Sequence, residues 1–150
     1  MATVRCYLPL SAQSLALLRD ERRLPGPLRA TAVTDDARAT DTAADQDELE
    51  YAAAQVAASS LADDGAPVVV AAADAQDRDV RADQGWWVQV DGVELARVAS
   101  LHLGDDVVSG DPGALAAAGG ADLELSWFDT TELDHVLDLT ERLARTETTG

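Results

Sequence analysis

The stretch VVVAAA at residues 68–73 decides the fold, because it is a continuous apolar run in a chain of which 26% is charged. Such a run, without alternating polar residues, is typical of a central strand that is covered on both faces. A buried helix is the alternative interpretation, since so short a run shows no clear period. We expect the rest of the chain to build a sheet around this segment.

The neighbouring segments alternate between apolar and polar residues or end at turn-forming residues. The predicted strands are residues 4–8, 28–34, 68–73, 86–90, 93–103 and 123–127. Asp91-Gly92 separates two of these strands and favours a tight hairpin, because a two-residue turn needs positive φ angles. Residues 24–27 (LPGP) predict a turn, and residues 35–46, 74–85 and 104–113 predict loops.

Apolar spacing and N-cap residues predict four helices. The first starts after Ser11, and the other three cover residues 47–61, 114–118 and 132–145. The last of these has its predicted cap at Thr130 or Thr131. The order βαβαβββαβα predicts an α+β fold, a two-layer sandwich with helices mainly on one face of a mixed sheet of about six strands. A ferredoxin-like core with an added hairpin is one version. We expect one domain over residues 1–150, with residues 146–150 frayed.

The charge is strongly acidic, with a net value of −17 and a pI near 4.1. Such a surface repels nucleic acids and anionic membranes and attracts a basic protein or a cationic ligand. Solubility of an Ala-rich domain, or adaptation to salt, is the simpler explanation. If the carboxylates formed two regular rows, the chain would resemble a nucleic-acid mimic.

The chain contains no Lys, Asn or Ile, which indicates a GC-rich genome. The absence of Lys excludes a Schiff-base amine and a P-loop lysine, and the absence of Asn excludes a Cys–His–Asn triad. One cysteine cannot form an internal disulfide, and no signal peptide or membrane span is predicted. We therefore expect a cytoplasmic protein.

Few residues suggest catalysis. Cys6 shares its strand face with Val4 and Leu8, which predicts a buried, inert thiol. His102 lies at the end of a strand, either at a pocket rim or as a hydrogen-bonded structural residue, and His135 is expected to be exposed.

Acidic residues give no clear site either. Residues His102, Asp105, Asp106 and Asp111 match no metal-binding spacing, so we expect no metal and no cofactor. The acidic pairs Glu48/Glu50 and Asp63/Asp64 are expected by chance in a chain with 28 acidic residues. The sequence contains no GxSxG, GxGxxG or HExxH motif, which disfavours an enzyme.

Adjacent Trp86 and Trp87 point to opposite faces if they lie in a strand. One of them would then be an exposed anchor for a partner, or both would cover the ends of a thin Ala-rich core.

Five stretches occur in an order that resembles an uncharacterised actinobacterial family of unknown function. They are VRCYLPL at residues 4–10, DELEYAA at 47–53, VVVAAA at 68–73, LARVASLHLGDD at 95–106 and LELSWFDTTEL at 123–133. The resemblance implies no activity, cofactor or catalytic residue, and the sequence departs from the family pattern at Cys6 and at Trp86-Trp87. The polar or aromatic positions inside these stretches are the candidate binding residues: Arg5, Tyr7, Glu48, Glu50, Tyr51, His102, Trp127 and Glu132.

Arg5 and Tyr7 share one strand face, so Glu50 or Tyr51 at a helix start could close over them. Three functions follow from these observations. The first is a non-catalytic binding or adaptor protein whose acidic surface engages a protein partner. The second is a ligand-binding protein or small enzyme with a pocket near Arg5, Tyr7 and His102, and the third is the nucleic-acid mimic.

Overall fold

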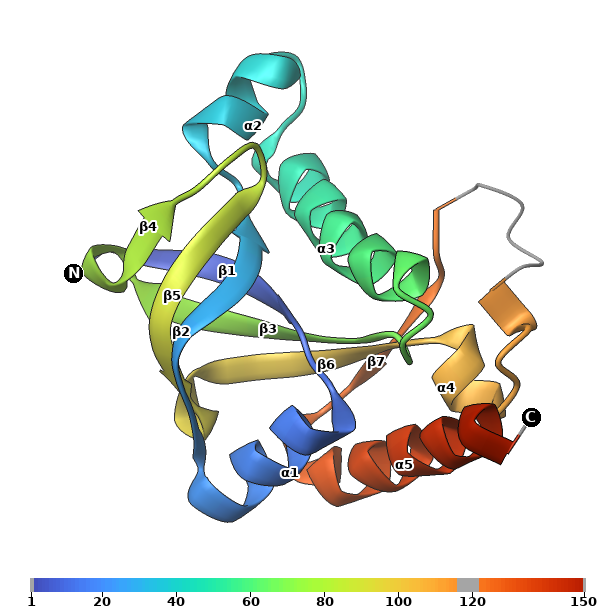
Figure 1. Ribbon diagram of the computed structural model, residues 1–150. Coiled ribbons are helices and arrows are strands. Elements are labelled where there is room, and N and C mark those ends of the chain that lie inside the picture. Colours follow the sequence, from blue (N-terminus) through green and yellow to red (C-terminus); the bar gives the residue numbers. More distant parts are fainter. Residues whose placement is uncertain (1, 116–121, 150) are drawn as a thin grey trace.

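The computed structural model describes residues 2–115 and 122–149, and the side chains up to residue 145 (Figure 1). One sheet has the strand order β4-β5-β2-β1-β3-β6-β7. Its strands are β1 (Thr3–Pro9), β2 (Arg23–Ala32), β3 (Val69–Gln76), β4 (Val80–Ala82), β5 (Trp87–Glu94), β6 (Val98–Gly104) and β7 (Leu125–Phe128). The α-helices of the described residues are α1 (Ala12–Glu21), α2 (Asp35–Thr40), α3 (Gln46–Asp63), α4 (Asp105–Ser109) and α5 (Leu133–Thr149). The predicted α+β class is confirmed.

The apolar run at residues 68–73 forms the start of β3, between β1 and β6, so the helical alternative is wrong. Val69 and Ala71 pack into one core, whereas Val70 and Ala72 pack into another on the opposite face. All four side chains are at most 1% exposed. The prediction of a central strand covered on both faces is therefore confirmed.

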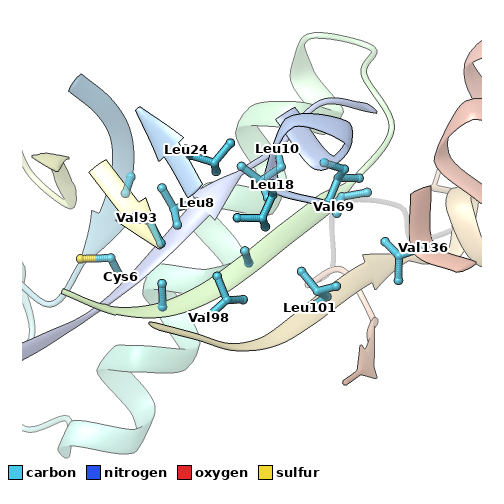
Figure 2. Close-up of a cluster of buried hydrophobic side chains, with 14 of the residues drawn as sticks. Cys6, Leu8, Leu10, Leu18, Leu24, Val69, Val93, Val98, Leu101 and Val136 are labelled. Carbon is cyan, nitrogen blue, oxygen red and sulfur yellow. The ribbon is translucent and has the colours of Figure 1, made fainter. Parts of the chain in front are cut away.

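The larger core lies inside a curl of the sheet. In Figure 1, β2 and β5 cross in front of β3 and β6, and α1 and α5 pack together at one end. Leu8, Leu18, Val69, Leu101 and Val136 converge there from three strands and two helices (Figure 2). The smaller core is the packing of α3 on the other face, through alanines that allow the helix to approach the sheet closely. Helices therefore cover both faces, where we expected them mainly on one.

Every strand pair in the described part of the chain is antiparallel, so the expected mixed sheet is wrong. The ferredoxin-like core is wrong for a different reason: β1 pairs directly with β2, whereas the split βαβ unit of that core places another strand between them. The Asp91-Gly92 hairpin is also wrong, because both residues lie inside β5. β5 pairs with β2 and β4, whereas β6 pairs with β3 and β7. The short 3₁₀ segment Leu95–Arg97 carries the chain between them.

The glycines that suggested turns instead allow β2 and β5 to approach each other. A Cβ on Gly26 would lie 1.7 Å from the carbonyl oxygen of Asp91, so only glycine fits. Pro25, Gly26 and Pro27 form an irregular part of β2 and not the predicted turn. The tight turn lies between β4 and β5, where Asp83 N–H donates to the Trp87 carbonyl over 3.0 Å and Gly85 has a φ of 61°.

Three predicted loops contain short elements. α2 falls in residues 35–46, because the Thr34 hydroxyl accepts from Ala37 N–H at 3.0 Å and caps it. The end of β3 and all of β4 fall in residues 74–85, and α4 falls in residues 104–113. Asp129, and neither predicted threonine, caps the last helical segment. Most of the predicted helix 114–118 lies outside the described residues.

Over the same described ranges, no helix is long and apolar enough to cross a membrane.

Candidate functional site

A cavity of about 670 Å³ lies between the sheet, α3 and the segment that leads into β7. The sheet supplies its floor, α3 one wall, and residues 122–127 the other wall. The floor residues are Arg5, Tyr7, Ala72, Ser100 and His102, and the wall residues are Glu50, Tyr51, Ala54, Gln55, Asp122, Leu123, Glu124, Leu125, Ser126 and Trp127.

The floor follows from strand register. Tyr7 of β1 lies opposite Ala72 of β3, which lies opposite Ser100 of β6. His102, two residues further along β6, lies opposite Trp127 of β7. Because side chains alternate across a strand, these positions all point to the face that α3 covers.

Two side chains fix the walls. The Gln55 side-chain amide donates to the Leu123 carbonyl at 2.8 Å and accepts from the Leu123 N–H at 2.9 Å. The Thr31 hydroxyl of β2 donates to the Ala53 carbonyl of α3 at 2.6 Å and is fully buried. The helix is thus bonded both to the sheet and to the opposite wall, and the cavity is preformed.

The charge of Arg5 is already balanced. Its Nε and Nη2 atoms donate to both oxygens of Asp74, at 2.7 and 3.1 Å, across a directly opposed pair of β1 and β3. These hydrogen bonds raise the pKa of Arg5. Both side chains are about one-third exposed, so the ion pair contributes little to the free energy of unfolding. Its effect is to hold Arg5 in place and to neutralise its charge.

Tyr7 is 8% exposed, and its phenol lines the cavity without a hydrogen bond to any described residue. Burial raises its pKa to about 12, with a further contribution from the nearby carboxylate of Glu50. The phenol is therefore protonated at neutral pH and can both donate and accept a hydrogen bond.

His102 has both of its predicted roles, since it lines the cavity and is hydrogen-bonded. Its Nε2 lies 2.8 Å from the hydroxyl oxygen of Ser100. Burial, and then the positive charge of Arg5, lower the pKa of His102. The imidazole is accordingly neutral at neutral pH.

The mouth combines aromatic rings with carboxylates. Trp127 and Tyr51 are 62% and 54% exposed, on opposite walls. Desolvation, followed by the interaction with the Asp122 carboxylate, raises the pKa of the Tyr51 phenol. Three carboxylates line the cavity, those of Glu50, Asp122 and Glu124. Arg5 is the one cation among the described lining residues, so their formal charge is net negative.

Six of the eight residues predicted from the sequence line this cavity: Arg5, Tyr7, Glu50, Tyr51, His102 and Trp127. The other two lie elsewhere. Glu48 lines a separate surface hollow, and the Glu132 carboxylate accepts from the Asp129 N–H at 2.9 Å in a capping box.

Sequence reasoning missed several lining residues. Gln55 follows Tyr51 by four positions and so shares its helix face, which was a usable signal. Ser100 precedes His102 by two positions and shares its strand face. Asp122 and Glu124 lie in irregular chain, although the sequence predicted a strand over residues 123–127, because β7 begins only at Leu125.

The remaining candidates lie outside the cavity. Cys6 faces the larger core with no exposed surface, so the predicted burial of its thiol is confirmed, and this burial raises its pKa to about 12. His135 is exposed, as predicted, with its ring centroid 6.2 Å from that of Phe128. Trp86 and Trp87 are both half-buried, and neither is the exposed anchor considered above. Among the described side chains, no group of three or more His, Cys, Asp or Glu residues could hold a metal ion.

Comparison with known proteins adds a family and no activity. The model of a family of unknown function, DUF6912, matches residues 4–137, which include every residue of the cavity. No curated protein and no solved structure matches the chain.

Proposed function

The chain belongs to this family of unknown function, and we propose that it is a binding protein whose ligand occupies the cavity between the sheet, α3 and residues 122–127. Tyr7 carries the proposal. Its side chain is 8% exposed and has no hydrogen bond among the described residues, and its hydroxyl oxygen is not one of the fully enclosed polar atoms, so it opens into the cavity and can bond to a ligand there. The cavity volume falls within the range of about 300–1,000 Å³ that is usual for ligand sites.

The arrangement supports binding more than catalysis. Arg5 is held by Asp74, His102 by Ser100 and Gln55 by the Leu123 backbone, so these polar groups are fixed before a ligand arrives. Preorganised hydrogen-bonding groups lower the cost of ordering a site. Cys6, the strongest nucleophile in the chain, lies on the opposite face of the sheet.

Native-ligand capture tests this proposal. The purified protein would be incubated with the small-molecule fraction of a GC-rich actinobacterial culture, washed, denatured and read by mass spectrometry. Ala54→Phe fills the cavity from α3, and Ala39→Phe makes the same change at an exposed position of α2. We expect a compound that the wild type and Ala39→Phe retain and Ala54→Phe does not. Equal retention by all three proteins, or by none, would overturn the proposal.

A protein partner is the second candidate, and the exposure of Trp127 favours it. An aromatic ring that is 62% exposed at the mouth of an acidic cavity suits an anchor for a basic surface. A tagged pull-down would be eluted in steps of rising salt, with Trp127→Ala as the variant. Loss of a stoichiometric partner with this variant supports the candidate, and unchanged recovery contradicts it.

The composition supports the proposed setting of the protein. We propose an actinobacterial source, on the complete absence of Lys, Asn and Ile, and a cytoplasmic location, on the single reduced, buried thiol. Fractionation of the native host, with detection by a specific antibody, tests the location.

A further inference from the structure

We infer that the ligand is an organic cation that carries N–H groups, a protonated primary amine or a guanidinium, an inference that rests on the proposed function and names its ligand class. The charges facing the cavity provide the first argument. Glu50, Asp122 and Glu124 line it, and Arg5, the one cation among the described lining residues, is neutralised by Asp74. An anionic ligand would therefore be repelled, whereas a cation gains a favourable potential over the whole cavity.

The aromatic rings of the mouth provide the second argument. Tyr51 and Trp127 are each more than half exposed and line opposite walls of a cavity that Asp122 and Glu124 also line. Cations are attracted to the faces of such rings, most strongly to tryptophan. The same chain already makes this contact elsewhere, where the Arg29 guanidinium lies 3.6 Å from the ring centroid of Trp87.

Tyr7 provides the third argument, and it separates cations with N–H groups from those without. Its oxygen is an unused acceptor in the floor of the cavity, and the charge of Glu50 raises its pKa, which places the two groups in the same electrostatic environment. An ammonium or guanidinium can donate to the Tyr7 oxygen while Glu50 balances its charge. A quaternary ammonium cannot donate and would leave Tyr7 unsatisfied.

This chemistry has two possible sources, a free amine or the side chain of a lysine or arginine on a protein partner. Four probes separate the cases in NMR titrations of the ¹⁵N-labelled protein. Butylammonium supplies charge and N–H groups, and 1-butanol is its neutral counterpart. Tetramethylammonium supplies charge alone, and the tripeptide acetyl-Gly-Lys-Gly-amide presents the amine on a peptide. The reporters are the Trp127 indole and the backbone amides of Tyr7, Ser100 and His102.

We expect butylammonium to shift these resonances with a dissociation constant at least tenfold lower than that of 1-butanol. Tyr7→Phe should weaken butylammonium binding about fivefold and leave tetramethylammonium binding unchanged, because only the former donates to the phenol. Glu124→Gln should weaken both cations about two- to fivefold. Glu21→Gln removes the same charge from an exposed position at the end of α1. It should change the dissociation constants of the two cations only as much as the altered net charge of the protein does. Binding of the tripeptide as tight as that of butylammonium identifies a partner side chain as the source, and tighter binding of butylammonium identifies a free amine.

The outcomes distinguish this inference from the proposed function. If 1-butanol binds at the cavity as tightly as butylammonium, the cation inference is wrong and the binding function stands. If Tyr7→Phe weakens tetramethylammonium as much as butylammonium, or weakens neither, the N–H requirement is wrong. If no probe shifts the cavity resonances, the cation inference is wrong, and the native-ligand capture alone decides the binding function.

Discussion

The bond between Gln55 and Leu123 allows a quantitative test of how the cavity is held open. Gln55→Ala removes two part-buried hydrogen bonds, of 2.8 and 2.9 Å, which join α3 to the opposite wall. At about 0.5–1.5 kcal/mol each, with the lower end expected at partly exposed positions, their loss should lower the free energy of unfolding by about 1–2 kcal/mol. For a domain of this size that corresponds to about 2–8 °C in Tm.

The same variant should affect the wall more than the fold. Within the described residues, Gln55 bonds to both backbone groups of Leu123, whereas α3 is also held to the sheet by Thr31 and by its alanine face. Without the Gln55 side-chain amide, local opening of the wall at Leu123 therefore costs less free energy than global unfolding. Hydrogen exchange at the Leu123 amide should accelerate by more than the change in global stability explains, while exchange at Ala53 and Ala57 follows global stability.

Two variants make this test specific. Gln55→Glu retains an acceptor for the Leu123 N–H but has no donor for its carbonyl, so it should give an intermediate loss of protection. Gln89→Ala removes an exposed glutamine from β5 and should leave both Tm and the exchange of Leu123 unchanged. If Gln55→Ala leaves Leu123 as protected as in the wild type, the two walls are held by other contacts and the account of the preformed cavity is incorrect.

Three further predictions concern the backbone, the histidine and the serine. Gly26→Ala should lower stability by more than about 3 kcal/mol, since a Cβ 1.7 Å from the Asp91 carbonyl oxygen forces β2 and β5 apart; a change below 1 kcal/mol in chemical denaturation would contradict this close approach. The pKa of His102 is lowered in the folded state, so the unfolded chain binds the proton first as pH falls, and stability should decrease as pH drops below about 6.5. His102→Gln should remove that part of the pH dependence, and identical stability profiles for the two proteins between about pH 5 and 7 would refute the shift. Ser100→Ala should leave the hydrolysis of p-nitrophenyl acetate at the wild-type background, whereas a serine-dependent rate would make the 2.8 Å contact with His102 catalytic.

The fold could be predicted where burial alone determines the pattern. Residues 68–73 are apolar because β3 is covered by α3 on one face and lies in the curl of the sheet on the other. The hairpin prediction at Asp91-Gly92 is wrong because an Asp-Gly pair occurs both in tight turns and in strands where a neighbouring strand comes unusually close. The sequence of this pair alone does not distinguish the two cases. The partner that requires it, Gly26, is more than 60 positions away and becomes visible only when β2 pairs with β5.

The site divides in the same way. Alternation along β1 places Arg5 and Tyr7 together, and the helix start at Glu50 and Tyr51 lies over them, as expected from the sequence. The antiparallel pairing of β6 with β3 then brings His102 to the same face, which no local pattern could establish. Asp122 and Glu124 depend on the Gln55 bond to the Leu123 backbone, a tertiary contact without a periodic signature.

The partition of one sheet between two environments explains why the binding residues are found together. Cys6 and Leu8 face the curl, where they pack with apolar side chains of β2, β3, β5 and β6 and of α1 and α5. Arg5 and Tyr7, on the alternate positions of the same strand, face a helix whose alanines are too small to fill the space in front of them. A larger residue at Ala54 would close the cavity and pack more apolar surface, so the small residue costs stability that a cavity-filling substitution could recover. That cost is what a bound ligand would offset, and it predicts that the ligand-free protein is stabilised by Ala54→Phe while binding is lost.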